Sequence, residues 1–124
     1  MRKLAVISAA LSLLASAGTA AGAGGAPPQI PRIPGTWSHA EINVTVRRVP
    51  HTLILDRGRI TQITTTQLTL LERDGSTADI PLDDQTLVQV DKRRASISSL
   101  RRRMFVQTMR IDGGAAVRVN ASAF

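Results

Sequence analysis

The chain alternates apolar and polar positions in short segments from about residue 41 onward. In Ile42–Val46, β-branched residues alternate with Asn43 and Thr45, a period of two that predicts a strand with one buried face. Further β-prone segments are expected at 52–55, 59–63, 67–72, 77–82, 86–90, 104–109 and 115–119. The pattern predicts an all-β domain of about six to seven short antiparallel strands.

Turn residues separate these segments and favour a compact barrel. Asp74-Gly75 and Asp112-Gly113-Gly114 are hairpin signals, because glycine tolerates positive φ. Gly58 interrupts a strand pattern, where an isolated glycine predicts a bulge or a bend. The only helix-like piece is one turn over Ser96–Leu100. Short strands with turns at regular intervals predict a small OB-like barrel, whose closure hides strand edges.

The first 23 residues have the pattern of a secretory signal peptide. A positive start is followed by an apolar run over 4–17 and by small residues, with cleavage expected after Ala20 or after Ala23. The apolar run is shorter than the roughly 20 residues that span a bilayer. We therefore expect an exported protein, periplasmic or extracellular, with no membrane span after cleavage.

Composition divides the remaining chain into two parts. Residues 24–40 are rich in proline and glycine and are expected to form a flexible linker, with the β-barrel domain over 41–124. The chain has no cysteine, so its stability has to come from a packed core of about 80 residues without disulfides.

The order and spacing of several short motifs over residues 58–119 match a known family at the level of pattern. These are Gly58-Arg59-Ile60 with Ile63, Leu68-Thr69-Leu70 before Asp74-Gly75, Thr86-x-Val88-x-Val90-Asp91, Ala95-Ser96-Ile97-x-x-Leu100, Met104-x-Val106 and Asp112-Gly113-Gly114. Together they resemble the bacterial domain of unknown function 5666. The resemblance implies a small OB-like barrel on an exported protein and implies no activity.

Two positions depart from that family's pattern. Its members usually carry glycine where this chain has Lys92 and Arg103. If the same turns are kept, these two residues bear backbone strain of about 1 kcal/mol each.

Positive charge is the most distinctive feature of the composition. Fourteen of the 16 basic residues are arginine, and without the leader 14 basic side chains face 9 acidic ones. Two basic triplets flank the predicted helical turn: Lys92, Arg93, Arg94, Arg101, Arg102 and Arg103. They predict a basic rim that binds phosphate, carboxylate or sulfate groups, for which the arginine fork is suited. The alternative is a solvated surface that keeps the domain soluble.

Other functional classes find little support. Nucleic acid is an unfavoured partner because Trp37, Phe105 and Phe124 are the only aromatic residues, and single-strand binding relies on aromatic stacking. Asp83-Asp84 is adjacent in sequence and is expected to shape a turn. No nucleophile pattern accompanies a histidine, so no enzymatic activity is expected.

Metal binding was considered at the two histidines of the chain. His39 and Glu41 would share a face of a strand, and His51 follows at a distance. Nothing in the sequence completes the three or four ligands of a tight site, so neither a metal nor another cofactor is expected.

The sequence therefore favours a non-enzymatic exported binding or scaffold module that engages an anionic envelope partner, such as an anionic envelope polymer, through the six basic residues. The alternative is a structural accessory domain that docks another envelope protein through a sheet edge or barrel mouth, with the charge incidental. Small-molecule binding inside the barrel is limited by size, since side chains fill small barrels.

Overall fold

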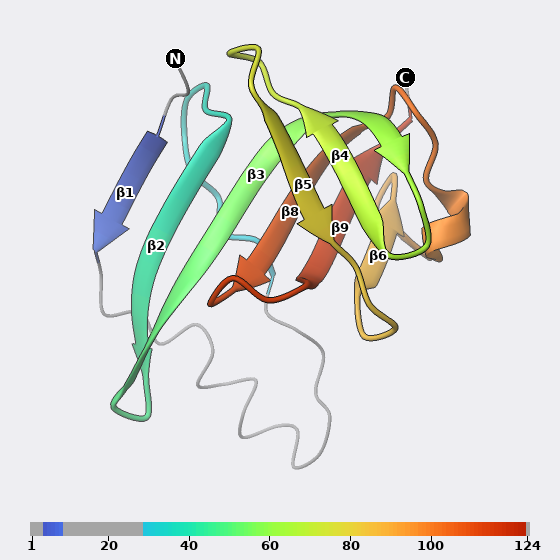
Figure 1. Ribbon diagram of the computed structural model, residues 1–124. Helices are drawn as coiled ribbons and strands as arrows, with labels where there is room; N and C mark the ends of the chain where they lie inside the picture. The colour runs from blue at the N-terminus through green and yellow to red at the C-terminus, as the bar shows by residue number, and fades with distance from the viewer. Residues whose placement is uncertain (1–3, 9–28, 124) are drawn as a thin grey trace.

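The computed structural model describes residues 4–8 and 29–123 and is nearly all β (Figure 1). The strands are β1 (Leu4–Ser8), β2 (His39–Val46), β3 (Val49–Ile63), β4 (Gln67–Leu71), β5 (Thr77–Pro81), β6 (Leu87–Val90), β7 (Arg93–Ala95), β8 (Phe105–Ile111) and β9 (Ala116–Ser122). One 3-10 turn, η1 (Ile97–Ser99), lies where the helical turn was expected. The all-β prediction is confirmed. No helix in these two ranges is long and apolar enough to cross a membrane.

The strands form one mixed sheet and not an antiparallel barrel. Their order is β1-β2-β3-β8-β9-β6-β7, and β4 and β5 branch from β3. The β1–β2 and β6–β9 pairs are parallel, and the sheet has nine strands where six to seven antiparallel ones were expected. A period of two is the same in parallel and antiparallel strands, so the sequence could not reveal this. In the described residues β5 pairs only with β4, so the sheet does not close and is only loosely barrel-like.

The 15-residue strand β3 joins the two halves of the sheet. One of its edges pairs with β8 over Leu53–Arg59. The opposite edge pairs first with β2, over Val49–Asp56, and then with β4, over Arg59–Ile63. Gly58 lies at this change of partner, and a Cβ atom there would be 2.6 Å from the Leu71 carbonyl oxygen. Gly58 is therefore required for the close approach of β4.

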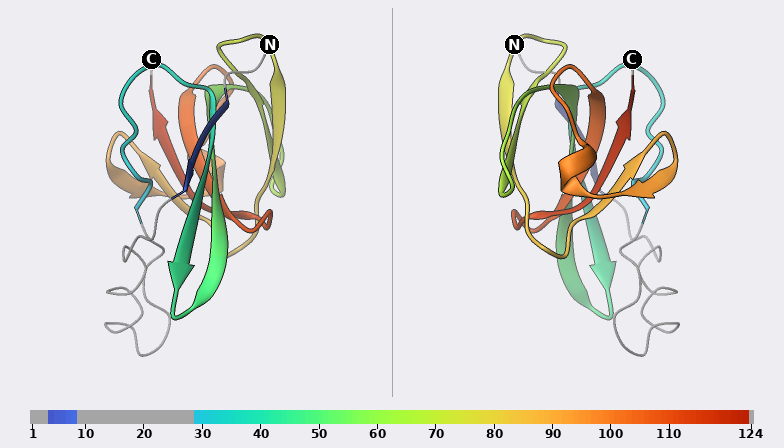
Figure 2. Two further views of the ribbon diagram at one scale, coloured as in Figure 1. Left: turned by 90° about the vertical axis from the view of Figure 1, so that its left-hand side faces the viewer. Right: turned by 90° about the vertical axis from the view of Figure 1, so that its right-hand side faces the viewer.

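Two apolar clusters pack on opposite faces of the sheet. Beyond Gly58 the β4–β5 hairpin faces β8 and β9 across the first cluster (Figure 2). Its buried members are Ile60, Leu68, Leu70, Ile80, Leu82, Val88, Leu100, Met104, Val106, Ala116, Val119 and Ala121. The second cluster contains Trp37, Ala40, Ile42, Val44, Leu53, Leu55 and Met109. Val106 and Met109 are three residues apart on β8, and because successive side chains of a strand alternate, they point to opposite faces.

The segment expected to be a flexible linker, residues 24–40, is in large part folded. Ile30 and Ile33 pack against the second cluster, and Trp37 is only 7% exposed. His39 and Ala40 already belong to β2. Its few large apolar residues attach the described part of this segment to the sheet. Residues 24–28 and both expected cleavage positions lie outside the described residues, while Leu4–Ser8 of the expected leader pair with β2.

Several turns place charged side chains on a left-handed backbone. Lys92 has φ of 68° and Arg103 has φ of 77°, in the left-handed region that glycine adopts without strain. Arg48, in the β2–β3 turn, has a similar φ of 66°. Each of these residues bears strain of about 1 kcal/mol that glycine would relieve.

The contact between Gly58 and Leu71 generates a stability prediction. We expect Gly58→Ala to lower the free energy of unfolding by about 1–3 kcal/mol, because the added methyl group collides with backbone that cannot move freely. Gly114→Ala is the control, since its Cβ would lie 3.4 Å from the nearest atom. Urea unfolding measures both. If the Gly58 variant is as stable as the unchanged protein, β4 does not depend on this contact.

Candidate functional site

The six residues of the predicted basic rim are all exposed, but they do not form a single row. Lys92 lies in the turn between β6 and β7, and Arg101–Arg103 lie between η1 and β8. On β7, Arg94 is opposite Gln89 and Arg93 is opposite Val90. Because neighbouring residues of a strand alternate, Arg93 and Arg94 point to opposite faces. The structure therefore divides the predicted rim between two surfaces.

A groove that the sequence did not reveal crosses the sheet beside Lys92. It consists of two clefts of about 500 Å³ and about 430 Å³ that share Phe105. We call it the Phe105 groove. Its basic side chains are Arg57, Arg59, Arg73 and Lys92, and its acidic ones are Glu72 and Asp91. The groove thus has a net positive charge, and Phe105 is 41% exposed where the two clefts meet.

Arg57 is held in a fixed position in the groove. Its guanidinium carbon lies 4.6 Å from the centre of the Trp37 ring and 5.8 Å from that of Phe105, within the range of cation–π attraction. With the Gln107 amide oxygen turned toward Arg57, that oxygen accepts from Nε at 3.0 Å and from Nη2 at 3.1 Å. Partial burial lowers the pKa of Arg57, yet an arginine stays charged in any protein environment. Arg57 is therefore a preorganised cation.

Strand register explains how the groove forms. Arg57 pairs with Gln107 and Arg59 with Phe105 across β3 and β8, and the next strand adds Asn120 opposite Gln107. Residues that pair in this way share one face of the sheet. In the sequence, the spacing of Arg57 and Arg59, two residues apart in a β-prone segment, already indicated that both side chains share one face. Only the fold shows that Phe105 lies beside them.

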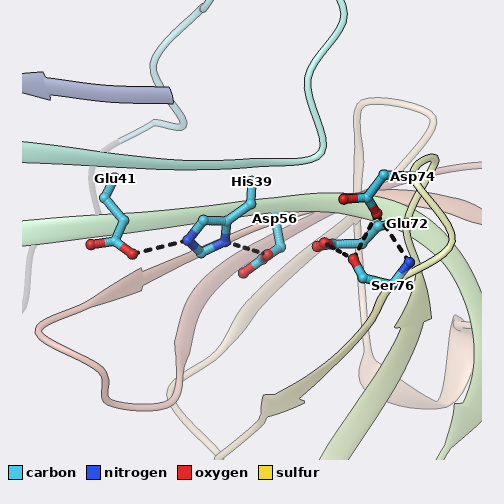
Figure 3. A network of polar contacts seen from close by, with 6 residues as sticks. All are labelled: His39, Glu41, Asp56, Glu72, Asp74 and Ser76. Carbon is cyan, nitrogen blue, oxygen red and sulfur yellow. Dashed lines mark hydrogen bonds and ion pairs between the residues drawn. The ribbon is translucent and has the colours of Figure 1, made fainter. Parts of the chain in front are cut away.

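A second group of polar side chains is buried on the other side of β3 (Figure 3). His39, Asp56 and Glu72 are 7%, 1% and 2% exposed. His39 Nδ1 lies 2.7 Å from Asp56 Oδ1, and Nε2 lies 3.0 Å from Glu41 Oε2. Ser76 Oγ lies 2.6 Å from Asp74 Oδ1 and 3.1 Å from Glu72 Oε1, so its single proton is shared between two carboxylates. We call His39, Asp56 and Glu72 the buried triad.

The triad lies at the point where β3 changes partner. His39 is opposite Asp56 at the start of β2, and Glu72 follows the last residue of β4. One ligand atom from each of the three lies within 4.8 Å of the others, close enough to hold a metal ion. In the sequence, His39 stands near only Glu41 and His51 as further candidate ligands. Asp56 and Glu72 come to His39 from two other parts of the chain, and no local pattern predicts their meeting.

His51 lies far from this group. It is near the β2–β3 turn, where its Nδ1 is 2.6 Å from Asp112 Oδ2. Asp83 forms the turn expected of it, accepting from the backbone N–H of Gln85 at 2.9 Å. Neither residue joins the groove or the buried triad.

Comparison with protein-family models, with curated proteins and with solved structures finds no match for this chain. The resemblance to domain of unknown function 5666 therefore stays a prediction, and the function has to be argued from the residues themselves.

The Asp112 carboxylate generates a pH prediction. The hydrogen bond with His51, and then that from the Thr52 N–H, hold the pKa of Asp112 below its ordinary value of 3.8. A lowered folded-state pKa contributes stability above the unfolded value, and this contribution is lost as the pH falls through the folded value. We expect the stability of Asp112→Asn to fall less on acidification from about pH 5 to about pH 2 than that of the unchanged protein.

The measurement is urea unfolding across this pH range. Asp84→Asn, which removes a charge from an exposed turn, is the control and should keep the original pH dependence. Equal pH dependence in the Asp112 variant and the unchanged protein would contradict the assignment.

Proposed function

We propose that this protein is a non-enzymatic exported module that binds an extended anionic envelope polymer along the Phe105 groove. The supporting observation is the groove itself, in which four basic side chains surround an exposed aromatic ring and one of them, Arg57, is held in place. Preorganised cations bind anions with a smaller entropic cost than mobile ones. Exposed residues of the basic rim, such as Arg94 on the same face, extend the positive surface.

The shape of the groove favours a polymer over a small anion. Arg57, Arg59 and Arg73 line one cleft and Lys92 lines the other, with Phe105 between them. A ligand that meets all four charges has to carry several anionic groups along its length. Arginine binds phosphate and sulfate in a bidentate manner, and Phe105 offers an apolar surface to the backbone between the charged groups. A phosphate- or sulfate-bearing polymer fits both features.

Single-stranded nucleic acid fits the groove less well. Such binding uses several open aromatic faces on which successive bases stack. Trp37 is largely buried and has Arg57 against its ring, which leaves Phe105 as the open ring of the groove. One open ring does not make a stacking track.

Docking of another envelope protein on a sheet edge is the alternative. The edge strand β7 carries exposed Arg93 and Arg94, and the edge strand β5 carries Asp79 and Pro81. Charged residues and proline on an edge strand resist the addition of a further strand. The groove is therefore the better-supported surface.

Binding to heparin and to linear polyphosphate tests the proposal, using protein purified after expression of the full chain. Trp37 is the only tryptophan and lines the groove, so its fluorescence reports an occupied site. We expect affinity to fall steeply as the NaCl concentration rises, because bound polyanions release counterions. Absence of binding, or binding insensitive to salt, would contradict the proposal. Tighter binding to single-stranded DNA than to polyphosphate of equal charge would instead favour nucleic acid.

Two glycine substitutions separate charge from folding. Lys92→Gly and Arg48→Gly each remove one exposed cation at nearly the same φ, 68° and 66°, so each relieves similar strain. We expect Lys92→Gly to weaken polyanion binding several-fold and to lower the slope of log affinity against log salt by about one. Arg48→Gly, at the distant β2–β3 turn, should leave both unchanged. Equal effects of the two variants would mean that net charge alone drives binding.

A further inference from the structure

We infer that the buried triad, His39, Asp56 and Glu72, is a binding site for one divalent transition-metal ion, with Zn²⁺ as the reference ion. The site shares Glu72 with the wall of the Phe105 groove, but it takes a cation and does not depend on the proposed function. The three ligand atoms lie within 4.8 Å of one another and come from β2, β3 and the turn after β4. Ligand atoms around a tetrahedral Zn²⁺ are about 3.3 Å apart, given metal–ligand distances of about 2.1 Å. His39 Nδ1 and Asp56 Oδ1 lie 2.7 Å apart, closer than this spacing, so a bound ion would separate these two side chains.

The chemistry of the triad suits this class of ion. An imidazole nitrogen with two carboxylates is a borderline donor set that favours Zn²⁺ over the all-oxygen cations Mg²⁺ and Ca²⁺. The two ionised carboxylates match the charge of a divalent cation. Asp56 and Glu72 are almost completely buried and both have polar partners in the structure, so an ion would join or replace these contacts.

Partners outside the triad orient two of its ligands. In the tautomer with its proton on Nε2, His39 donates to Glu41 Oε2 at 3.0 Å and presents an unprotonated Nδ1 toward Asp56, which is the form a metal ion requires. A carboxylate that holds the distal N–H of a histidine is the usual outer partner of a metal-bound imidazole. Ser76 Oγ lies between Glu72 Oε1, at 3.1 Å, and Asp74 Oδ1, at 2.6 Å, and links Glu72 to the β4–β5 turn (Figure 3).

A buried hydroxyl supplies an independent observation. Thr108 is fully buried, and its Oγ1 has no hydrogen-bond partner among the described residues. Thr108 is directly opposite Asp56 in the β3–β8 register, and paired residues share a face with their Cβ atoms about 5 Å apart. Thr108 therefore lies beside Asp56 on the face of the sheet that carries the triad, and an ion bound there would give this buried hydroxyl a polar neighbour.

Calorimetric titration of Zn²⁺ into protein stripped with EDTA is the first test. We expect one ion per chain and a rise in melting temperature of several degrees, because the ion binds only the folded arrangement of three separate segments. Mg²⁺ and Ca²⁺ should bind much more weakly. Absence of saturable Zn²⁺ binding would overturn the inference and leave the triad a hydrogen-bonded network only.

Variants locate the ion. Glu72→Gln should abolish binding, and Glu41→Gln should weaken it about 10- to 100-fold, because Glu41 acts through His39. His51→Gln, which removes the only other histidine, should bind as tightly as the unchanged protein. Loss of binding in His51→Gln, or unchanged binding in the other two variants, would place the ion elsewhere.

Nitrogen NMR of the unchanged protein gives a readout that does not depend on how the variants fold. On addition of Zn²⁺, the His39 Nδ1 resonance should move to the range of a metal-bound nitrogen while Nε2 keeps its proton. If the His51 ring responds and the His39 ring does not, the assignment is wrong.

Discussion

The close approach of the Leu71 carbonyl to Gly58 is the constraint on which the rest of the structure depends. Because Gly58 has no side chain, β4 can pair with the edge of β3 directly after β2 has left it. The β4–β5 hairpin is thereby brought across the sheet, where it covers the first apolar cluster. The same approach brings Glu72 to Asp56 and places Leu71 and Arg73 in the wall of the Phe105 groove.

Alternation along β3 and after β4 gives the molecule two chemically different sides. Asp56 belongs to the buried triad, whereas the next residue, Arg57, belongs to the groove. Glu72 is buried in the triad although it also borders the groove, and its neighbour Arg73 lines the groove. Acidic groups thus point inward and basic groups outward from consecutive positions. A cation inside and an anionic polymer outside are therefore compatible in one small domain.

Local features of the fold could be predicted from the sequence, and features set by pairing could not. The strands and the turn at Asp74-Gly75 follow from alternation and from glycine, which act over a few residues. The parallel pairing of β6 with β9 joins segments about 30 residues apart, and no short-range pattern specifies it. For the same reason the basic triplets were visible in the sequence, whereas the groove around Phe105 and the meeting of His39 with Asp56 were not.

The packing of Ile30, Ile33 and Trp37 on the sheet moves the boundary of the domain. A chain cut at residue 41, where the strand pattern begins, would lose the ring that lies against Arg57 and the histidine of the buried triad. It would keep β3 through β9, so its circular dichroism spectrum would still be that of an all-β protein. Parts of both sites would nevertheless be missing. The smallest unit suitable for binding work therefore starts before Ile30, within a stretch whose composition resembles a spacer.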